Sequence, residues 1–188
     1  MFLADPAQAQ QNAFEQGDKI INVGISLGGY RSGYVGTRST GMIPLSVSFE
    51  KGINDKFSVG GYAGYASWNY GSAGYKYGWS YTSIGARGSF HYLPWLNESL
   101  DLGLDQEKID LYVTAIVGLE FQRLTGEWRG LDYNNQTRLF IGPVLGVRYM
   151  FNPKLGGFFE AGRGALGYGN LGLAIRLYRA RLNFSEKG

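Results

Sequence analysis

The sequence contains no cysteine, which excludes a disulfide scaffold and metal sites built on thiolate ligands. It also lacks any apolar run close to the roughly 18 residues that a transmembrane helix needs. The formal net charge is only +3, and the basic residues are scattered, so nothing indicates a surface for nucleic acid. No phosphate-binding loop, metal cluster or triad spacing is present, and we expect no cofactor.

Glycine and aromatic residues are abundant instead. The chain has 30 Gly, 14 Tyr, 11 Phe and 4 Trp, and its share of glycine is more than twice the average of about 7%. Turns and tightly packed strand interiors would require this much glycine. A length of 188 residues suits one domain.

Residues 137–151 carry the clearest pattern in the chain. One face is large and apolar at nearly every second position: Leu139, Ile141, Pro143, Leu145, Val147, Tyr149 and Phe151. The alternate face is mostly small and includes Arg138 and Arg148. A period of two indicates a β-strand. The segment is longer than the usual strand of about five or six residues and suits the roughly 9–11 residues of a tilted strand that crosses a membrane.

The direction of these two faces decides the kind of barrel. If the apolar face pointed inward, glycine would form much of the outer surface and would shield nothing. If it points into lipid, the other face needs only small and polar residues that fit inside a narrow barrel. That inversion is typical of transmembrane β-barrels. A soluble lipid binder of the lipocalin type is the alternative, and the glycine-rich opposite face argues against it.

The same alternation recurs along the chain. We predict strands at residues 18–29, 42–51, 57–68, 79–92, 109–122, 137–151, 157–164 and 170–177. Longer polar loops alternate with mostly short turns, as in bacterial outer-membrane barrels, where the long loops are extracellular. The long loops are residues 30–41, 69–78, 123–136 and, shorter, 165–169; the connection 93–108 fits poorly because it is long and should be periplasmic. The prediction is an all-β fold, a transmembrane antiparallel up-and-down barrel of about eight strands.

The two ends of the chain are expected to lie outside this barrel. We divide the sequence into a leader or signal remnant at residues 1–17, the barrel at 18–184 and a tail at 185–188. Ala7-Gln8-Ala9 has the small-x-small form of a signal-peptidase site, although a basic region and a full apolar segment do not precede it. A truncated export signal and a polar leader therefore both remain open.

The sequence resembles the small OmpA/OmpX-type outer-membrane barrels and the porin-like outer-membrane β-barrel families. The resemblance lies in YTSIGARGSFHY (81–92), KIDLYVTAIVGLEF (108–121) and FFEAGRGALGYGNLGLAIRL (158–177), and it covers most of the chain after Asp18. It implies a location in the outer membrane of Gram-negative bacteria, in contact with lipid and lipopolysaccharide. Such motifs identify an architecture and no activity. Family members usually end on an aromatic residue of the last strand, whereas this chain continues past Leu177.

An eight-stranded barrel has an interior that side chains can fill. The predicted strands place an interior polar network inside: Glu50, Arg87, His91, Asp110, Glu120, Arg148, Glu160 and Arg176. Counting back from the turns puts His91 opposite Asp110 and Arg148 opposite Glu160. A satisfied polar core that fills the barrel is the simpler interpretation, and a gated path for protons or ions through these charges is the other.

Aromatic residues gather near both ends of the predicted strands. They form two predicted girdles: Phe49, Phe57, Phe90, Tyr92, Trp95, Tyr149 and Phe151 on the periplasmic side, and Tyr65, Trp68, Trp79, Phe121 and Tyr168 on the other. Interfacial Trp and Tyr form such belts in membrane proteins. Arg163 falls on the outward face of the seventh strand, where we expect it to snorkel towards the interface or to contact anionic headgroups.

Three kinds of function remain open from the residues. The first is a structural or interaction barrel, in which loops 30–41, 69–78 and 123–136 dock onto another envelope protein or a host surface protein. The second is a narrow pore for ions or small solutes. The third is an enzyme, because some outer-membrane barrels modify lipids with a His–Ser pair. His91 points inward near the periplasmic end with Asp110 rather than a serine as its partner, so we expect no catalytic residues.

Overall fold

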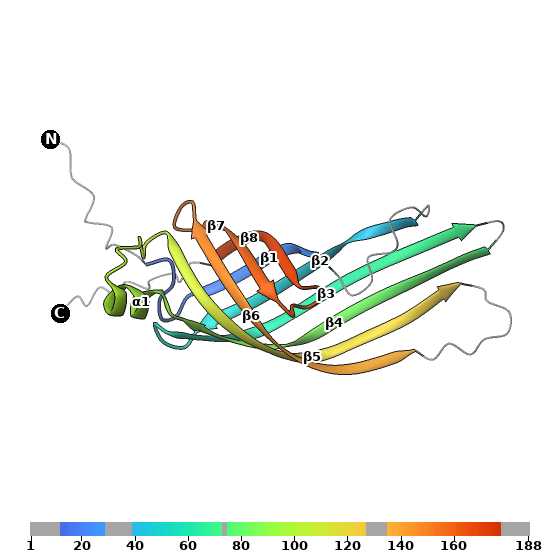
Figure 1. Cartoon of the computed structure of the whole chain (residues 1–188), viewed down its shortest axis with the longest axis horizontal. Helices are drawn as coiled ribbons and strands as arrows, with labels where there is room; N and C mark the ends of the chain where they lie inside the picture. The colour runs from blue at the N-terminus through green and yellow to red at the C-terminus, as the bar shows by residue number, and fades with distance from the viewer. Residues whose placement is uncertain (1–11, 29–38, 73–74, 127–134, 178–188) are drawn as a thin grey trace, which may run out of the picture.

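The computed structural model describes residues 12–28, 39–72, 75–126 and 135–177, and its strands close into one antiparallel barrel (Figure 1). Each strand pairs with its neighbours in sequence, and the last pairs with the first. The eight strands are β1 Lys19–Leu27, β2 Ser39–Gly52, β3 Phe57–Ser72, β4 Tyr75–His91, β5 Ile109–Gly126, β6 Gln136–Met150, β7 Leu155–Gly162 and β8 Gly169–Leu177. The predicted up-and-down barrel of eight strands is confirmed.

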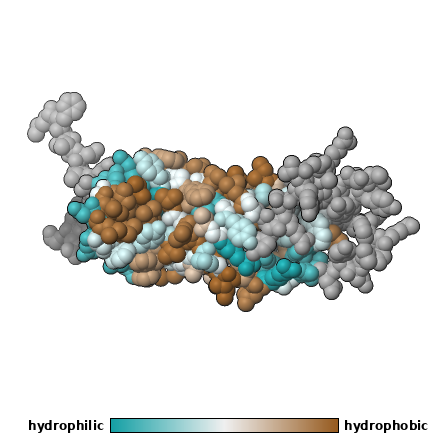
Figure 2. Space-filling view, in the orientation of Figure 1, coloured by the Kyte–Doolittle hydropathy of each residue, from teal (hydrophilic) through white to brown (hydrophobic). Residues whose placement is uncertain are grey.

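The distribution of side chains is the reverse of that in a water-soluble barrel. Along β6 the residues alternate between buried and exposed, and the exposed set is the apolar one. Leu139 and Ile141 expose 68% and 69% of their surface, whereas Arg148 on the other face exposes 1%. Apolar side chains cover much of the barrel face seen in Figure 2. Such a surface needs lipid around it, because apolar area is unfavourable in water.

No helix in the described part of the chain is both long and apolar enough to cross a membrane.

The strands differ greatly in length at one end, which we call the outer end. β3 and β4 continue through the predicted loop 69–78 as a paired hairpin, with Ser72 opposite Tyr75, and β5 continues to Gly126. The prediction of a loop at 69–78 was wrong, because the backbone pairing of β3 and β4 continues there as far as Ser72 and Tyr75. β2 to β6 project well beyond β7, β8 and β1 (Figure 1). We call the projecting parts of β3 to β6 the wall. Predicted loop residues 29–38 and 127–134 lie outside the described residues.

The opposite, inner end carries the short turns and a short helix. Part of the long connection 93–108 forms helix α1, Leu93–Leu100, where the sequence predicted no helix. A proline in its first turn suits a helix start, and Asp101 ends the helix in the left-handed conformation with φ 48°. Leu93 is buried, with 1% of its surface exposed. The helix accounts for the length of this connection.

Candidate functional site

The innermost buried charges form a chain of three side chains. Arg148 donates from Nη1 to Oδ2 of Asp110 at 2.5 Å, and His91 Nδ1 lies 2.8 Å from Oδ1 of the same carboxylate. The Arg148 guanidinium also lies over the Tyr112 ring, 4.9 Å from its centroid. None of the four side chains exposes more than 3% of its surface. Charges at this depth persist only when they are paired and hydrogen-bonded.

A second buried group lies one layer further out and is centred on Arg87. Its Nη2 lies 2.6 Å from Glu160 Oε1 and 3.0 Å from Glu50 Oε1. Tyr112 donates its hydroxyl to Glu160 at 3.0 Å, so it connects the two layers. Ser89 donates to Glu50 Oε2 at 2.6 Å. Together the two layers form the charged network, which spans β2, β4, β5, β6 and β7.

Glycine on the inner face makes room for these large groups. A Cβ built on Gly146 would lie 2.2 Å from two carbons of the Tyr112 ring, and a Cβ on Gly118 would lie 2.1 Å from the Tyr62 hydroxyl. Both tyrosines therefore lie across positions where the opposing residue has no side chain. The alternation of small and large inner residues fills the lumen.

His91 extends the hydrogen bonding of the network. Ser58 Oγ lies 2.6 Å from Glu50 Oε2 and 3.0 Å from His91 Nε2. A carboxylate only accepts hydrogen bonds, so Ser58 gives its single proton to Glu50 and accepts from His91. Asp110 likewise accepts from the other ring nitrogen. His91 thus links Asp110 on one side to Ser58 and Glu50 on the other in one hydrogen-bonded series.

Ser58, His91 and Asp110 stand in the order of a nucleophile, a base and an orienting acid. The expectation that His91 has no serine partner was therefore wrong. Three observations nevertheless argue for a structural role. Ser58 exposes 1% of its surface, its proton is directed to Glu50, and Phe14 covers the imidazole with parallel rings whose centroids lie 3.4 Å apart.

The segment before β1 closes the inner mouth of the barrel. Arg176 on β8 donates to the backbone oxygens of Asn12, at 2.9 Å, and of Ala13. Ala13 donates its backbone N–H to Gln106 at 2.7 Å. These bonds position the Phe14 ring inside the mouth, where it exposes 8% of its surface. Residues 12–18 of the predicted leader thus contact the barrel, and residues 1–11 lie outside the described residues.

Asp18 is the titratable group at the edge of this mouth. Its Oδ2 lies 3.3 Å from Arg176 Nε and also accepts the N–H of Glu15. Burial raises the pKa of the Asp18 carboxyl above its ordinary value, and the nearby Arg176 opposes this effect without cancelling it. The neutral form of Asp18 is therefore the one that folding favours.

An apolar layer lies beyond the charged network, towards the outer end. It consists of Tyr62, Ile116, Phe140 and Val144, with Ala165 packed against them. The segment between β7 and β8 folds into the outer mouth, where Leu166 is buried. The Arg163 guanidinium lies over the Phe140 ring at 5.1 Å. Arg163 thus faces the interior, and its predicted outward position was wrong. Gly162 lies where the chain turns from β7 into this segment, and its φ of 136° is a value that favours glycine.

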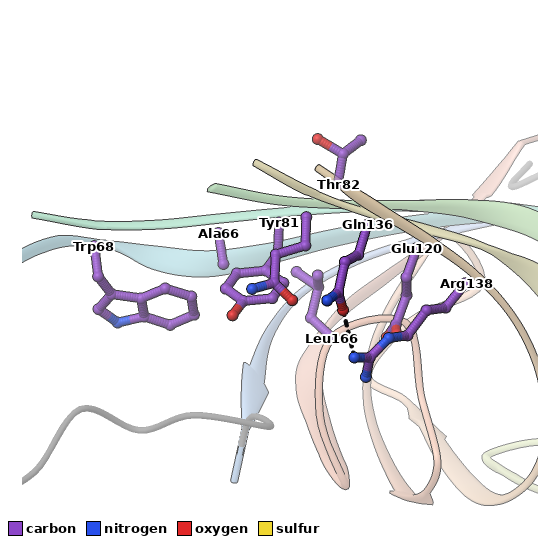
Figure 3. Close-up of a pocket in the computed structure, with 9 residues that line it drawn as sticks. Ala66, Trp68, Tyr81, Thr82, Glu120, Gln136, Arg138 and Leu166 are labelled. Carbon is purple, nitrogen blue, oxygen red and sulfur yellow. Dashed lines mark hydrogen bonds between the residues drawn. The ribbon is translucent and has the colours of Figure 1, made fainter. Parts of the chain in front are cut away.

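A cavity of about 240 Å³ lies above the apolar layer (Figure 3). Leu166 borders it from the β7–β8 segment, and the other lining residues come from the wall: Ala66, Trp68, Tyr81, Thr82, Glu120, Gln122, Gln136 and Arg138. The rings of Trp68 and Tyr81 meet edge to face with centroids 5.6 Å apart. Arg138 donates to Gln136 at 2.5 Å.

Glu120 belongs to this cavity and not to the charged network. It stands directly opposite Arg138 in the β5–β6 pairing. Within the part of the chain that the structure describes, no hydrogen bond or ion pair to the Glu120 carboxylate is recorded. The other seven predicted interior groups are buried below the apolar layer: Glu50, Arg87, His91, Asp110, Arg148, Glu160 and Arg176.

The predicted cross-strand pairs were wrong in register. His91 stands opposite Tyr112, and its contact with Asp110 is diagonal. Arg148 stands opposite Phe158 on β7, and its ionic partner is Asp110 on β5. Glu160 instead pairs with Arg87 across the lumen. Helix α1 lies between β4 and β5, and the turn before β7 is shorter than expected. Counting from assumed turns therefore misplaced both pairs.

The predicted girdle residues divide into several groups. Phe57 and Phe90 pack together on the outside with ring centroids 5.1 Å apart, and Phe49, Tyr65, Tyr149, Phe151 and Tyr168 expose two fifths of their surface or more. Phe121 alternates outward on β5, Trp95 is exposed on α1, and Tyr92 precedes that helix. Trp68 instead lines the cavity, and its cross-strand partner Trp79 is on the same face. A lipid-facing girdle position for these two residues was wrong. The others remain predictions.

No group of three or more His, Asp or Glu residues that could hold a metal ion occurs within the described ranges.

The closed barrel, its apolar outer face and its buried ionic interior define a class of protein. The chain is a closed eight-stranded antiparallel β-barrel with the apolar outer face and polar interior that are typical of transmembrane β-barrels. No family model matches the sequence, and neither does any curated protein.

Solved structures that are similar in fold include two outer-membrane proteins. OprG from Pseudomonas aeruginosa is 13% identical, with a TM-score of 0.44 over 90% of this chain and 99% of its own. Ail of Yersinia pestis, in complex with the heparin analogue sucrose octasulfate, is 14% identical, with a TM-score of 0.46 over 86% of this chain and 96% of its own. Ail in a phospholipid bilayer nanodisc is 15% identical, with a TM-score of 0.45 over 86% and 100%.

Proposed function

We propose that this protein is a closed outer-membrane scaffold that binds partners at its outer end and does not conduct. The observation that carries the proposal is the filled lumen. Between the inner mouth and the cavity lie Phe14, the two layers of the charged network and the apolar layer, in that order along the barrel axis. A path for a solute would have to pass all of them.

The wall supports the second half of the proposal. β7, β8 and β1 have eight or nine residues each, close to the roughly 9–11 that a tilted strand needs to cross a membrane. β3, β4 and β5 have 16, 17 and 18 residues, so much of their length stands outside the lipid. Extra ordered structure at the outer end is what a binding role needs. Partners on another envelope or host surface protein would meet the wall, which includes the β3–β4 hairpin of residues 69–78, together with the predicted loops 30–41 and 123–136.

A narrow pore is the second candidate, and the buried ions are the observation that favours it. Glu50, Arg87, Asp110, Arg148 and Glu160 form a nearly continuous series of charges along the axis. Each charge, however, has a short hydrogen bond to a neighbour, and moving an ion through would separate these pairs. Breaking one buried pair costs about 3–5 kcal/mol, which is a high barrier for passage.

Electrical recording of the refolded protein in a planar bilayer tests closure. We expect no discrete current steps, provided that insertion is shown by heat-modifiable migration of the same sample and that gramicidin added afterwards gives steps. Reproducible steps that change when Arg87→Gln is introduced would contradict the closed scaffold and favour the pore.

A shortened wall tests the binding role. Ser67 and Ser80 are direct partners in the β3–β4 pairing, so Asn-Gly in place of residues 68–79 makes a two-residue hairpin turn that leaves the rest of the barrel intact. Bacteria that display this variant should lose attachment to host-cell or envelope surfaces, while the unmodified protein confers it. Equal attachment by both, at equal surface amounts, would remove the wall from the proposal.

A further inference from the structure

The cavity in the wall is a separate compartment from the charged network. Its floor is formed by Ala66 and by Leu166, which packs against Gly64 so closely that a Cβ there would lie 2.7 Å from the leucine Cγ. Below the floor is the apolar layer, in which Tyr62, Ile116, Phe140 and Val144 pack against one another. A molecule that enters the cavity therefore ends its path there, so the cavity has the form of a binding site and not of a pore entrance.

The charges in the cavity cancel. Glu120 and Arg138 are direct cross-strand partners on the same face, and they are the only ionisable acid and base among the residues described as lining the cavity. A ligand with a net charge would meet attraction and repulsion of similar size. The pair instead favours a neutral ligand that donates a hydrogen bond to the carboxylate and accepts one from the guanidinium.

The hydrogen-bonding groups of the cavity suit hydroxyls. The carboxylate of Glu120 only accepts, the guanidinium of Arg138 only donates, and the amides of Gln122 and Gln136 do both. A hydroxyl group donates and accepts, so a row of hydroxyls can satisfy all four side chains. Figure 3 shows Glu120, Gln136 and Arg138 together on one side of the cavity, with the Trp68 and Tyr81 rings on the other.

The two aromatic rings supply the complementary apolar surface. The indole of Trp68 and the phenol ring of Tyr81 meet edge to face and leave ring surface along the cavity. A ligand that fits must therefore have a face of C–H groups as well as a rim of hydroxyls. Drug-sized ligands occupy pockets of about 300–1,000 Å³, so a cavity of about 240 Å³ suits a single small ring.

We propose that this cavity binds one neutral hexopyranose ring, most simply the terminal sugar of a glycan. The C–H face of the ring would lie against Trp68, and its hydroxyls would bridge Glu120, Arg138 and the two glutamines. The inference rests on the proposed function, because it names what the outer end binds. The same sugar chemistry occurs on bacterial lipopolysaccharide and on host glycoproteins.

Saturation-transfer NMR on the protein in nanodiscs tests this assignment. The probes are the methyl glycosides of glucose, galactose, mannose and N-acetylglucosamine, with the zwitterionic amino acids glycine and glutamine as comparison ligands. We expect saturable binding of at least one glycoside, with transfer strongest to the protons on one face of its ring. Binding of the amino acids without any glycoside, or of no probe at all, would overturn the proposal.

Matched variants locate the binding. Trp68→Leu and Glu120→Gln should each weaken it by about tenfold or more. Phe121→Leu, on the outward face of β5, and Arg123→Gln, at an exposed position near the end of β5, should leave it unchanged. Heat-modifiable migration confirms that every variant is folded. Equal effects in both sets would place the binding outside the cavity and overturn the proposal.

Two further experiments identify the source of the sugar and test whether the lumen is closed. Oligosaccharides released from lipopolysaccharide and from glycoproteins compete for the bound methyl glycoside, and whichever competes identifies the source. Bilayer recording is made on the same preparation. A silent bilayer without glycoside binding overturns the sugar assignment alone, whereas current steps overturn the closed scaffold whether or not a sugar binds.

Discussion

The inner and outer halves of the lumen are built from similar residue types and behave in opposite ways. Both contain Arg, Glu and aromatic side chains on alternating strand positions. In the inner half every carboxylate of the charged network has a partner at 3.0 Å or less, and the side chains are almost completely buried. In the outer half Glu120 stands beside an open cavity with no recorded partner among the described residues. The contrast separates a region that serves stability from one that is available for a ligand.

The largest difference in stability is expected between a variant that loses a charge in the inner half and one that loses a charge in the outer half. Arg148→Met leaves Asp110 buried without its strongest partner and should lower the free energy of unfolding by about 3–5 kcal/mol. Arg138→Met removes an exposed guanidinium from the cavity and should change it by at most about 1 kcal/mol. Urea titration in detergent micelles, followed by tryptophan fluorescence, measures both. Similar losses would show that the two halves do not differ as described.

A second comparison concerns the ring that closes the inner mouth. Phe14→Ala should lower the free energy of unfolding by about 1.5–3 kcal/mol, because a nearly buried side chain loses its contact with His91. Phe121→Ala, on the lipid face of β5, serves as the control for loss of an aromatic side chain in the same assay. If the Phe14 variant unfolds at the same urea concentration as the unmodified protein, residues 12–18 do not hold the mouth closed.

Two inner glycines offer a finer comparison. Gly146→Ala puts a methyl group into the Tyr112 ring, which is enclosed on all sides, and we expect a loss of about 1–3 kcal/mol. Gly64→Ala meets Cγ and Cδ1 of Leu166 at 2.7 and 2.9 Å, and this flexible side chain borders the cavity and can move into it. Its cost should be below about 1 kcal/mol. A cost for Gly64→Ala that matches that of Gly146→Ala would mean that the cavity has no spare room.

The smallest effect concerns pH at the inner mouth. The pKa of Asp18 is raised on folding, so the carboxyl contributes most to stability when protonated, and this contribution is lost as the pH rises from about 4 through the raised value. Asp18→Asn cannot ionise. The unfolding free energy of the variant should therefore gain on that of the unmodified protein as the pH rises above about 4. A constant difference between pH 4 and 8 would contradict a raised pKa.

Much of the fold could be read from alternation alone, and the reason is physical. In lipid every second residue of a strand must be apolar, so the pattern of residues 137–151 predicted both the strand and its orientation. The same alternation, in which successive residues of a strand face opposite sides, placed Glu50, Arg87 and Arg148 inside. We call this assignment of sides parity. Parity does not depend on loop length, and this part of the prediction was therefore insensitive to errors at the turns.

Register and closure could not be read in the same way. The partner of a residue depends on the geometry of the connection, and α1 and the turn before β7 differed from the lengths assumed for them. Phe14 lies in a polar segment that is held against the barrel by contacts distant in sequence, with Gln106 and Arg176. Trp68 was assigned to lipid because it lies near a predicted strand end, although its parity with Tyr62 and Ala66 placed it inside. Parity is the stronger signal where the two disagree.

The unequal strand lengths have a consequence for how the molecule sits among its neighbours. A barrel with a level rim is equivalent from every direction in the plane of the membrane. Here β3 to β6 stand high on one side, while β7, β8 and β1 end low on the other. The outer end therefore has a front and a back. For a round pore, rotation about the membrane normal has no effect on what its neighbours meet. For this barrel, the same rotation decides which neighbouring molecule the inner face of the wall is turned towards.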